Sequence, residues 1–207
     1  MNPNDLDTAQ LVALAAALGW ASGVRLYLVV FLTGLVGALG WVSLPPGLHL
    51  LQSPLVLGAS AVLAMIEFFA DKVPAVNAVW DGLHTVLRVP GGALLAAGVF
   101  GGDHAQWTLV AALAGGALAA TSHVAKTTTT ASLAAFPEPL THTGISLVSD
   151  IAVPVMLWLA LSHPALFAVA LFVVVAGMVG TTVVLFRFLR ALVRRLTGRS
   201  PAIGPKT

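Results

Sequence analysis

The sequence predicts an all-α, polytopic membrane protein: a bundle of about six helical segments that cross the membrane or enter it and turn back. Hydrophobic residues make up 58% of the 207 residues and charged residues only 9%, whereas soluble domains carry about 25% charged residues. Several apolar runs approach the ~20 residues that a helix needs to cross a bilayer. Backbone groups inside a bilayer must pair within their own segment, which favours helices, and the alternating strands of a membrane barrel are absent.

The first apolar run extends over residues 11–42. As one straight helix it would be about 48 Å long, whereas the hydrocarbon core is only about 30 Å thick. The run must therefore tilt, protrude or break. Ser22-Gly23 is the natural place for a break, and Arg25 follows it directly. The prolines in 44–47 end the segment.

Prolines, glycines and polar residues divide the rest of the chain. Pro74 suits the first turn of a helix, and the residue before it disfavours helix, so a break is expected there. Pro90-Gly91-Gly92 is expected to end that helix. The expected segments are a span over 54–70, a helix over 74–89, a short piece over 93–100, spans over 107–122, 144–161 and 165–186, and an irregular polar connection over 127–139.

Residues 1–186 are expected to form a single transmembrane domain, with two related halves at 9–100 and 106–186. In each half an alanine-rich helix leads into a polar break, and a helix with a lone acid followed by a proline comes later. Internal repeats with broken helices are common in transporters. The repeat is weak, because alanine-rich helices resemble one another by composition alone.

Residues 187–207 form a basic tail, and no acid follows Asp150. Basic residues beside a membrane helix indicate the cytoplasmic side, so we expect a multi-pass protein of a bacterial inner membrane with a cytoplasmic C-terminus. Binding of nucleic acid by the tail is the less favoured alternative, since such tails are routine after a last span. No basic region precedes the first run, so no cleavable signal peptide is expected.

The sequence contains no motif for a familiar catalytic or metal centre. It has no cysteine, which excludes disulfides and thiolate chemistry. It also lacks the zinc-protease, phosphate-loop and nucleophile-elbow motifs. No catalytic residue, metal ligand or cofactor is therefore expected.

Arg25 is the first candidate for solute binding, because an ionisable group far inside a span is costly and marks a functional site. If the helix breaks at Ser22 and Gly23, the next helix begins beside Arg25 with free N–H groups, which favours an anion. The alternative is a purely structural pairing of Arg25 with Glu67 or Asp150.

A second polar patch contains His123, Lys126 and the threonines of 127–130. Lys126 corresponds roughly to Arg25 in the first half, and the threonine hydroxyls could donate to an anion or accept around a cation. The alternative is an ordinary helix end at the interface followed by a loop.

Three carboxylates are candidates for ion or proton coupling. Glu67 and Asp71 are four residues apart and share a helix face, which would suit a proton relay or a cation site, with Lys72 neutralising one of them. A wet helix end is the alternative. Asp150 lies well inside its span, so we expect it to pair with Arg25 or Lys126 and to take part in proton coupling.

The helix over 74–89 carries a narrow polar stripe at helical spacing, formed by Asn77, Asp81, His84 and Arg88. Such a helix could lie flat on the membrane with Trp80 as an anchor. It could instead line a water-filled cavity, which we favour slightly because prolines bracket it. Asn77 and Arg88 would then meet the solute, while Asp81 and His84 would serve coupling.

Three motifs resemble those of a bacterial membrane family known only as a domain of unknown function. They are Ala-Ser-Gly-Val-Arg-Leu-Tyr at 21–27, Glu-Phe-Phe-Ala-Asp-Lys-Val-Pro at 67–74 with Asp81 downstream, and the lysine patch followed by Ser-x-x-x-Asp at 146–150. The resemblance covers about residues 10–160. It supports these positions and implies no substrate.

The leading functional hypothesis is a small secondary transporter or channel for a small solute, with an anion as one option, coupled to ions or protons by intramembrane carboxylates. Nearly every mid-chain charge lies at an expected helix break, as in broken-helix transporters. An intramembrane enzyme acting on a lipid or isoprenoid through Asp81, His84 and Glu67, and a non-catalytic lipid-binding or scaffold protein, are the alternatives. The expected partners are membrane lipids, the solute or ion and, because the chain is small, a second copy in a homodimer.

Overall fold

The computed structural model describes residues 6–101, 105–133 and 139–196, and this part of the chain is all-α. Asp7 caps the first helix, because its side chain accepts from the backbone of Gln10 and the Gln10 side chain accepts in return. The elements are α1 (Thr8–Ala38), the 3-10 helix η1 (Pro46–Gln52), α2 (Pro54–Ala70), α3 (Pro74–Val99), α4 (Ala105–Leu133), α5 (Pro139–Ser162) and α6 (Pro164–Leu196).

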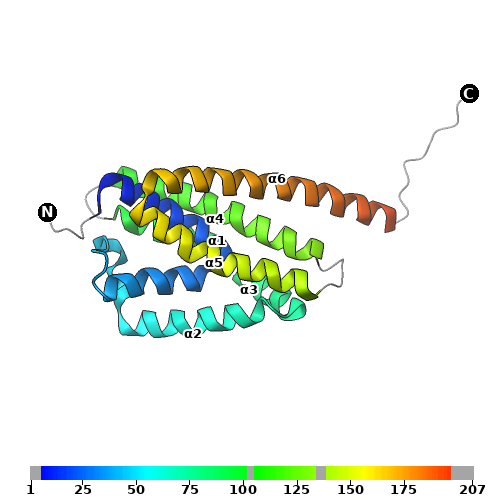
Figure 1. The fold of residues 1–207 in the computed structure, drawn as a ribbon, viewed down its shortest axis with the longest axis horizontal. Coiled ribbons are helices and arrows are strands. Elements are labelled where there is room, and N and C mark those ends of the chain that lie inside the picture. The colour runs from blue at the N-terminus through cyan, green and yellow to red at the C-terminus, as the bar shows by residue number, and fades with distance from the viewer. Residues whose placement is uncertain (1–5, 102–104, 134–138, 197–207) are drawn as a thin grey trace, which may run out of the picture.

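The helices form an elongated bundle whose described ends lie far apart (Figure 1). By length and composition, α1, Val79–Val99, Ala105–Ser132 and Pro164–Phe188 could each cross a membrane. The pair η1 and α2, bent by 69°, could supply a fifth span, and Ser146–Ser162 is a shorter apolar helix. The protein is therefore a multi-pass membrane protein.

Many large apolar side chains lie exposed on the outer surface of the bundle. Leu55 is 82% exposed, Phe172 75% and Val86 74%, and the most apolar stretch of α6 has no buried residue at all. Such a surface suits lipid rather than water. On α3, Val79, Leu83 and Val86 face outward, so this helix does not lie flat with its polar stripe in water.

The expected break in the first apolar run is confirmed. Arg25 has non-helical backbone angles, φ −146° and ψ 78°, inside α1. The direction in which the chain runs along α3 reverses at this point. Before Arg25, successive residues of α1 contact α3 residues with falling numbers, down to Arg88. After Arg25, the residues of α1 and then η1 contact α3 residues with rising numbers. In chain order these contacts are Gly19 with Gly92, Gly23 with Arg88, Leu26 with Gly91 and Gly47 with Gly98.

Helix α1 therefore enters the bundle, turns at Arg25 and returns, as Figure 1 shows in blue. We call the part before Arg25 its first limb and the part after Arg25 its second limb. Near its start, Val12 lines a cavity together with Phe100, which directly follows α3. After its end, η1 lies against Gly98 near the same end of α3. Both ends of α1 thus lie at one end of the bundle. Length alone would count α1 as a span, but its contacts make it re-entrant.

Small residues allow the first limb of α1 to cross α4 closely. A Cβ atom on Gly19 would lie 2.6 Å from the Cα of Gly115. A Cβ on Gly23 would lie 2.0 Å from Ser122 Oγ and 2.1 Å from the carbonyl oxygen of Ala119. Close approach through small residues is a usual way for membrane helices to associate, and here it brings the break in α1 against the middle of α4.

Two expected helix ends are wrong. Pro90 lies inside α3, which continues to Val99. The two glycines after it pack tightly, with Gly91 against Leu26 and Gly92 against Gly19 and Ala119. Tertiary packing thereby holds the helix through a proline that would end it in isolation, as neighbouring helices often do in membranes.

The irregular connection expected from residue 127 is also wrong over its first part, because α4 runs on to Leu133. The polar side chains there bond back to their own helix. Thr127 donates to the His123 carbonyl at 3.0 Å and Thr130 to the Lys126 carbonyl at 2.9 Å. This back-bonding satisfies the hydroxyl groups within an apolar environment. The second half therefore has a continuous helix where the first half is broken.

Candidate functional site

Eight charged side chains form one continuous row of ion pairs inside the bundle, which we term the charge ladder. They include every Asp, Glu, Lys and Arg that the structure describes between Thr8 and Phe186. Their signs alternate along the row, so four cations match four carboxylates. In order, the row is Lys72, Asp150, Arg25, Asp71, Lys126, Asp81, Arg88 and Glu67.

The charge ladder lies at membrane depth. At 1.5 Å per residue, about 17 Å of α3 separate Arg88 from Val99, and about 18 Å of α5 separate Asp150 from Ser162. Those distances are about half of a ~30 Å hydrocarbon core. Unpaired charges at such a depth are costly, and alternate pairing reduces that cost.

One end of the charge ladder is completely buried. Arg88 and Glu67 have no exposed side-chain surface, and Arg88 Nη2 lies 2.9 Å from Glu67 Oε1. The same nitrogen lies 2.8 Å from Asp81 Oδ1. Breaking a buried pair by removing one partner is strongly destabilising, because it leaves an uncompensated charge. Asp81 and Arg88 confirm that the polar stripe of α3 faces the interior.

The middle of the charge ladder caps the break in α1. Lys126 Nζ donates to both oxygens of Asp71, at 2.8 and 3.1 Å, and to the carbonyl of Val24 at 3.4 Å. Arg88 Nη1 lies 3.5 Å from the carbonyl of Gly23. A helix end leaves carbonyls without intrahelical partners and carries negative partial charge. Two cations of the charge ladder therefore satisfy the end of the first limb.

The other end of the charge ladder reaches the surface of the bundle. Arg25 forms ion pairs with Asp71 at 3.0 Å and with Asp150, and its Nη2 donates to Ser146 at 3.1 Å. Lys72 lies 3.5 Å from Asp150 and is 24% exposed. The pairing of Asp150 with Arg25, one of two predicted partners, is thus confirmed.

His123 forms a side branch at the buried end. The Thr85 hydroxyl donates to the Asp81 carbonyl at 2.6 Å, so its single proton is used. His123 Nε2, at 2.9 Å from that hydroxyl, must then be the donor. Its Nδ1 lies 3.4 Å from Arg88 Nη1 and must be the acceptor. The contacts therefore select a neutral His123 with its proton on Nε2.

The structure brings together most of the predicted site residues and separates others. Seven belong to the charge ladder: Arg25, Glu67, Asp71, Asp81, Arg88, Lys126 and Asp150. Gly23 and His123 contact Arg88. Ser22 is buried beside the break but bonds within its own helix, to Leu18 at 2.5 Å.

His84 is set apart from the charge ladder in its described contacts. Its Nδ1 lies 2.8 Å from the Trp80 carbonyl, and its ring stacks on Trp80 at 4.0 Å between centroids. The side chain of Asn77 lies outside the described part of the structure. The sequence pointed to Lys72 only as a neutralising neighbour of Glu67 or Asp71, and to Ser146 only within the Ser-x-x-x-Asp motif, so neither was predicted as a site residue, although Ser146 lies one helical turn before Asp150.

Several buried polar atoms of the charge ladder lack a well-aligned hydrogen bond, even where an ion-pair partner is close. Glu67 Oε2, Arg88 Nε and two nitrogens of Arg25, Nε and Nη1, have no hydrogen-bond partner among the described residues. Buried polar groups are usually paired, so such exceptions suit a functional role. In the same part of the chain, no three His, Asp or Glu side chains are arranged to hold a metal ion.

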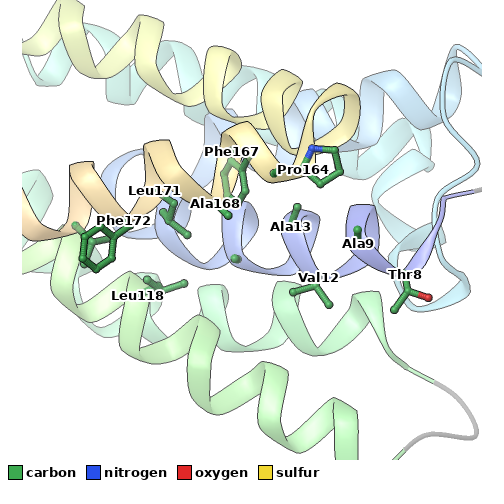
Figure 2. Close-up of a pocket in the computed structure, with 13 residues that line it drawn as sticks. Thr8, Ala9, Val12, Ala13, Leu118, Pro164, Phe167, Ala168, Leu171 and Phe172 are labelled. Carbon is green, nitrogen blue, oxygen red and sulfur yellow. The ribbon is translucent and has the colours of Figure 1, made fainter.

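Two cavities differ in character. A cavity of about 320 Å³ lies between the second limb of α1, α2 and α5, and Arg25 and Asp150 are its only charged lining residues. A larger groove of about 880 Å³ lies between the starts of α1 and α6 (Figure 2). Its lining is apolar apart from Thr8, so it offers no group for proton or ion chemistry.

Comparison with known proteins identifies the family without an activity. No curated protein matches the chain, and no solved structure matches it. A family model described as a domain of unknown function, DUF4126, matches residues 12–183. The break in α1, both partners of each ion pair in the charge ladder and the cavity beside Arg25 all lie within that range. The chain therefore belongs to the DUF4126 family of domains of unknown function.

Proposed function

We propose that the protein is a small secondary transporter or channel in which the charge ladder couples solute movement to proton or ion movement. The observation that carries the proposal is the re-entrant α1, whose break at Arg25 lies within the charge ladder. Non-helical backbone at membrane depth is tolerated where protein or a water-filled cavity surrounds it. Transporters use such broken helices to build a central binding site.

The number and placement of the charges support this proposal over a scaffold. Apolar residues of similar volume often stabilise a bundle as well as buried ion pairs do. Eight charges that link α1 to α5 are therefore not required for folding alone. Asp71 and Asp81 each contact two cations, and such shared partners suit a protein that exchanges between two arrangements.

The alternating signs suggest how coupling would work. A proton that binds Asp150 removes its charge and frees Arg25 from one partner, so that Arg25 can accept an anionic group. Glu67, at the opposite end, has an oxygen without a hydrogen-bond partner among the described residues and could hold a second proton. Release of the proton restores the ion pair and expels the anion.

The basic residues support a cytoplasmic C-terminus. Arg187 and Arg190 lie in the last turns of α6, whereas residues 26–71 and 89–125, which include the connections at the opposite end, contain no Lys or Arg. Cytoplasmic loops are enriched in both residues. We also propose a location in a bacterial inner membrane, in line with the family that the motifs resemble, and a homodimer because a single copy is small.

An intramembrane enzyme receives less support. Its expected acid–base residues would be Asp81, His84 and Glu67, but His84 stacks on Trp80, and both acids are paired with Arg88. A lipid-binding scaffold would use the apolar groove in Figure 2, and the charge ladder would then have no role in its function.

Flux measurements on purified protein in vesicles test the proposal. Vesicles containing a pH dye would receive chloride, nitrate, methanesulfonate, benzenesulfonate, potassium or choline, with protein-free vesicles as the baseline. We expect at least one solute to drive proton movement in the wild type, and Asp150→Asn to abolish it while remaining folded. Arg190→Gln, an exposed change on α6, is the control and should retain flux. Equal rates with Asp150→Asn and wild type would contradict the coupling role.

A further inference from the structure

We propose that the cavity beside Arg25 binds a small organic anion that has one negative charge and a compact apolar body. This inference names the substrate class of the proposed transporter and so rests on that function. The charged head would pair with Arg25, and the apolar body would occupy the rest of the cavity. The apolar lining residues are Leu28, Phe31, Ala61, Ala64, Met65 and Phe68.

The size of the cavity limits the ligand. Its volume of about 320 Å³ lies at the lower end of the usual range for small-molecule sites. At the ~30 Å³ that one water occupies in the liquid, it holds about ten heavy atoms. A phospholipid is much too large, and an inorganic anion would leave most of the apolar wall without contacts.

The polar end of the cavity sets the charge of the ligand. Arg25 is 1% exposed, and its Nε and Nη1 have no hydrogen-bond partner among the described residues, although Nη1 lies 3.0 Å from Asp71. A planar guanidinium recognises carboxylate-like or sulfonate-like groups through two donors. Asp150 neutralises Arg25 in the structure, so a monoanion enters without a net change in charge only when one proton enters with it.

Asp150 is the group placed to take that proton. Arg25 faces it from α1 and Lys72 from the turn after α2, and Asp71 lies beyond Arg25. The described part of α6, which also packs against α5, carries no titratable residue before Arg187. Protonation of the carboxylate would break its pairing with both cations and leave the side of Arg25 that faced Asp150 open to the anion, while Asp71 remains paired with Arg25.

The apolar wall also indicates how the ligand enters. Met65 lines the cavity and is 57% exposed, and its helix α2 lies at the edge of the bundle (Figure 1), where lipid would lie. The cavity therefore opens sideways on the bilayer side of α2. An anion with an apolar body can approach through the interfacial region, whereas a strongly hydrated ion cannot.

Benzenesulfonate is a suitable probe because it has an apolar ring, one charge at every working pH, and about the right size. We expect it to raise the melting temperature of the purified protein by binding the folded state. Methanesulfonate, which lacks the ring, and benzenesulfonamide, which lacks the charge, should give no shift at equal concentration. Uptake of one proton per anion predicts an affinity that rises by up to about tenfold for each unit by which the pH falls.

Substitutions separate this cavity from other surfaces. Ala64→Phe should fill the cavity and abolish the shift, while Val62→Phe, on the outer face of the same helix and 60% exposed, should retain it. Arg25→Lys keeps the charge but loses the planar donor pair, so it should weaken binding at least tenfold. The proposal is overturned if benzenesulfonamide binds equally well, if Ala64→Phe still binds, or if benzenesulfonate gives no shift.

The outcome separates the ligand class from the transport function. If benzenesulfonate fails but another solute drives proton flux that needs Asp150, the ligand class is wrong and the transporter remains. If benzenesulfonate binds as expected but no solute moves protons, the site is right and the transport function is wrong.

Discussion

Neutralising both partners at the buried end of the charge ladder should cost less than the sum of the costs of neutralising each partner alone. Arg88 and Glu67 are completely buried and 2.9 Å apart. Arg88→Gln leaves four carboxylates with three cations, and Glu67→Gln leaves four cations with three carboxylates. At an effective dielectric constant of 20, unit charges about 4 Å apart attract by about 4 kcal/mol. Breaking a buried pair typically costs about 3–5 kcal/mol.

In the double variant Glu67→Gln/Arg88→Gln, the remaining six charges are again balanced, because Asp81 keeps Lys126 as a partner at 3.5 Å. We therefore expect each single variant to lower the free energy of unfolding by about 3–5 kcal/mol. The double variant should lose at least about 2 kcal/mol less than the sum of the two, a coupling within the range for contacting residues.

Equilibrium unfolding in lipid bicelles, followed by tryptophan fluorescence, measures these differences at neutral pH. Arg190→Gln, which removes an exposed charge from α6, is the matched control and should change stability by less than about 0.5 kcal/mol. If the costs of the two single substitutions simply add in the double variant, the two residues do not form one charge-balanced unit, and the reasoning about the charge ladder fails.

Two further predictions concern the re-entrant α1. Gly23→Leu should prevent folding, because even a Cβ atom at Gly23 would lie 2.0 Å from Ser122 Oγ. The control Gly58→Ala has no atom within 4 Å of the new Cβ and should leave the yield of folded protein unchanged or improve it. Equal yields of the two variants would refute the tight crossing. The chain has no cysteine, so single cysteines can be labelled from one side of the membrane. Thr8→Cys and Ser43→Cys should react from the same side and Arg190→Cys from the other; opposite labelling of the first two would show that α1 crosses the membrane.

Composition alone identified the chain as an all-α membrane protein. Each segment in hydrocarbon must satisfy its own backbone groups and bear the cost of its own charges, so the sequence of that segment is enough to judge it. The length of the first apolar run required a tilt, a protrusion or a break, and the Ser-Gly pair placed the break within two residues of its position at Arg25. The same reasoning found seven of the eight members of the charge ladder, because a charge within an apolar run is visible without any knowledge of packing.

The tertiary structure decided which charge pairs with which, and where helices continue. Pro90 ends a helix by its local chemistry, yet the contacts of Gly91 and Gly92 with α1 and α4 hold α3 through it. Asp150 had two candidate cations, and only the fold brings Arg25 to it while Lys126 pairs with Asp71 and Asp81. Pairing depends on distances between residues on different helices, such as Arg25 on α1 and Asp150 on α5, and local sequence preferences contain no information about those distances.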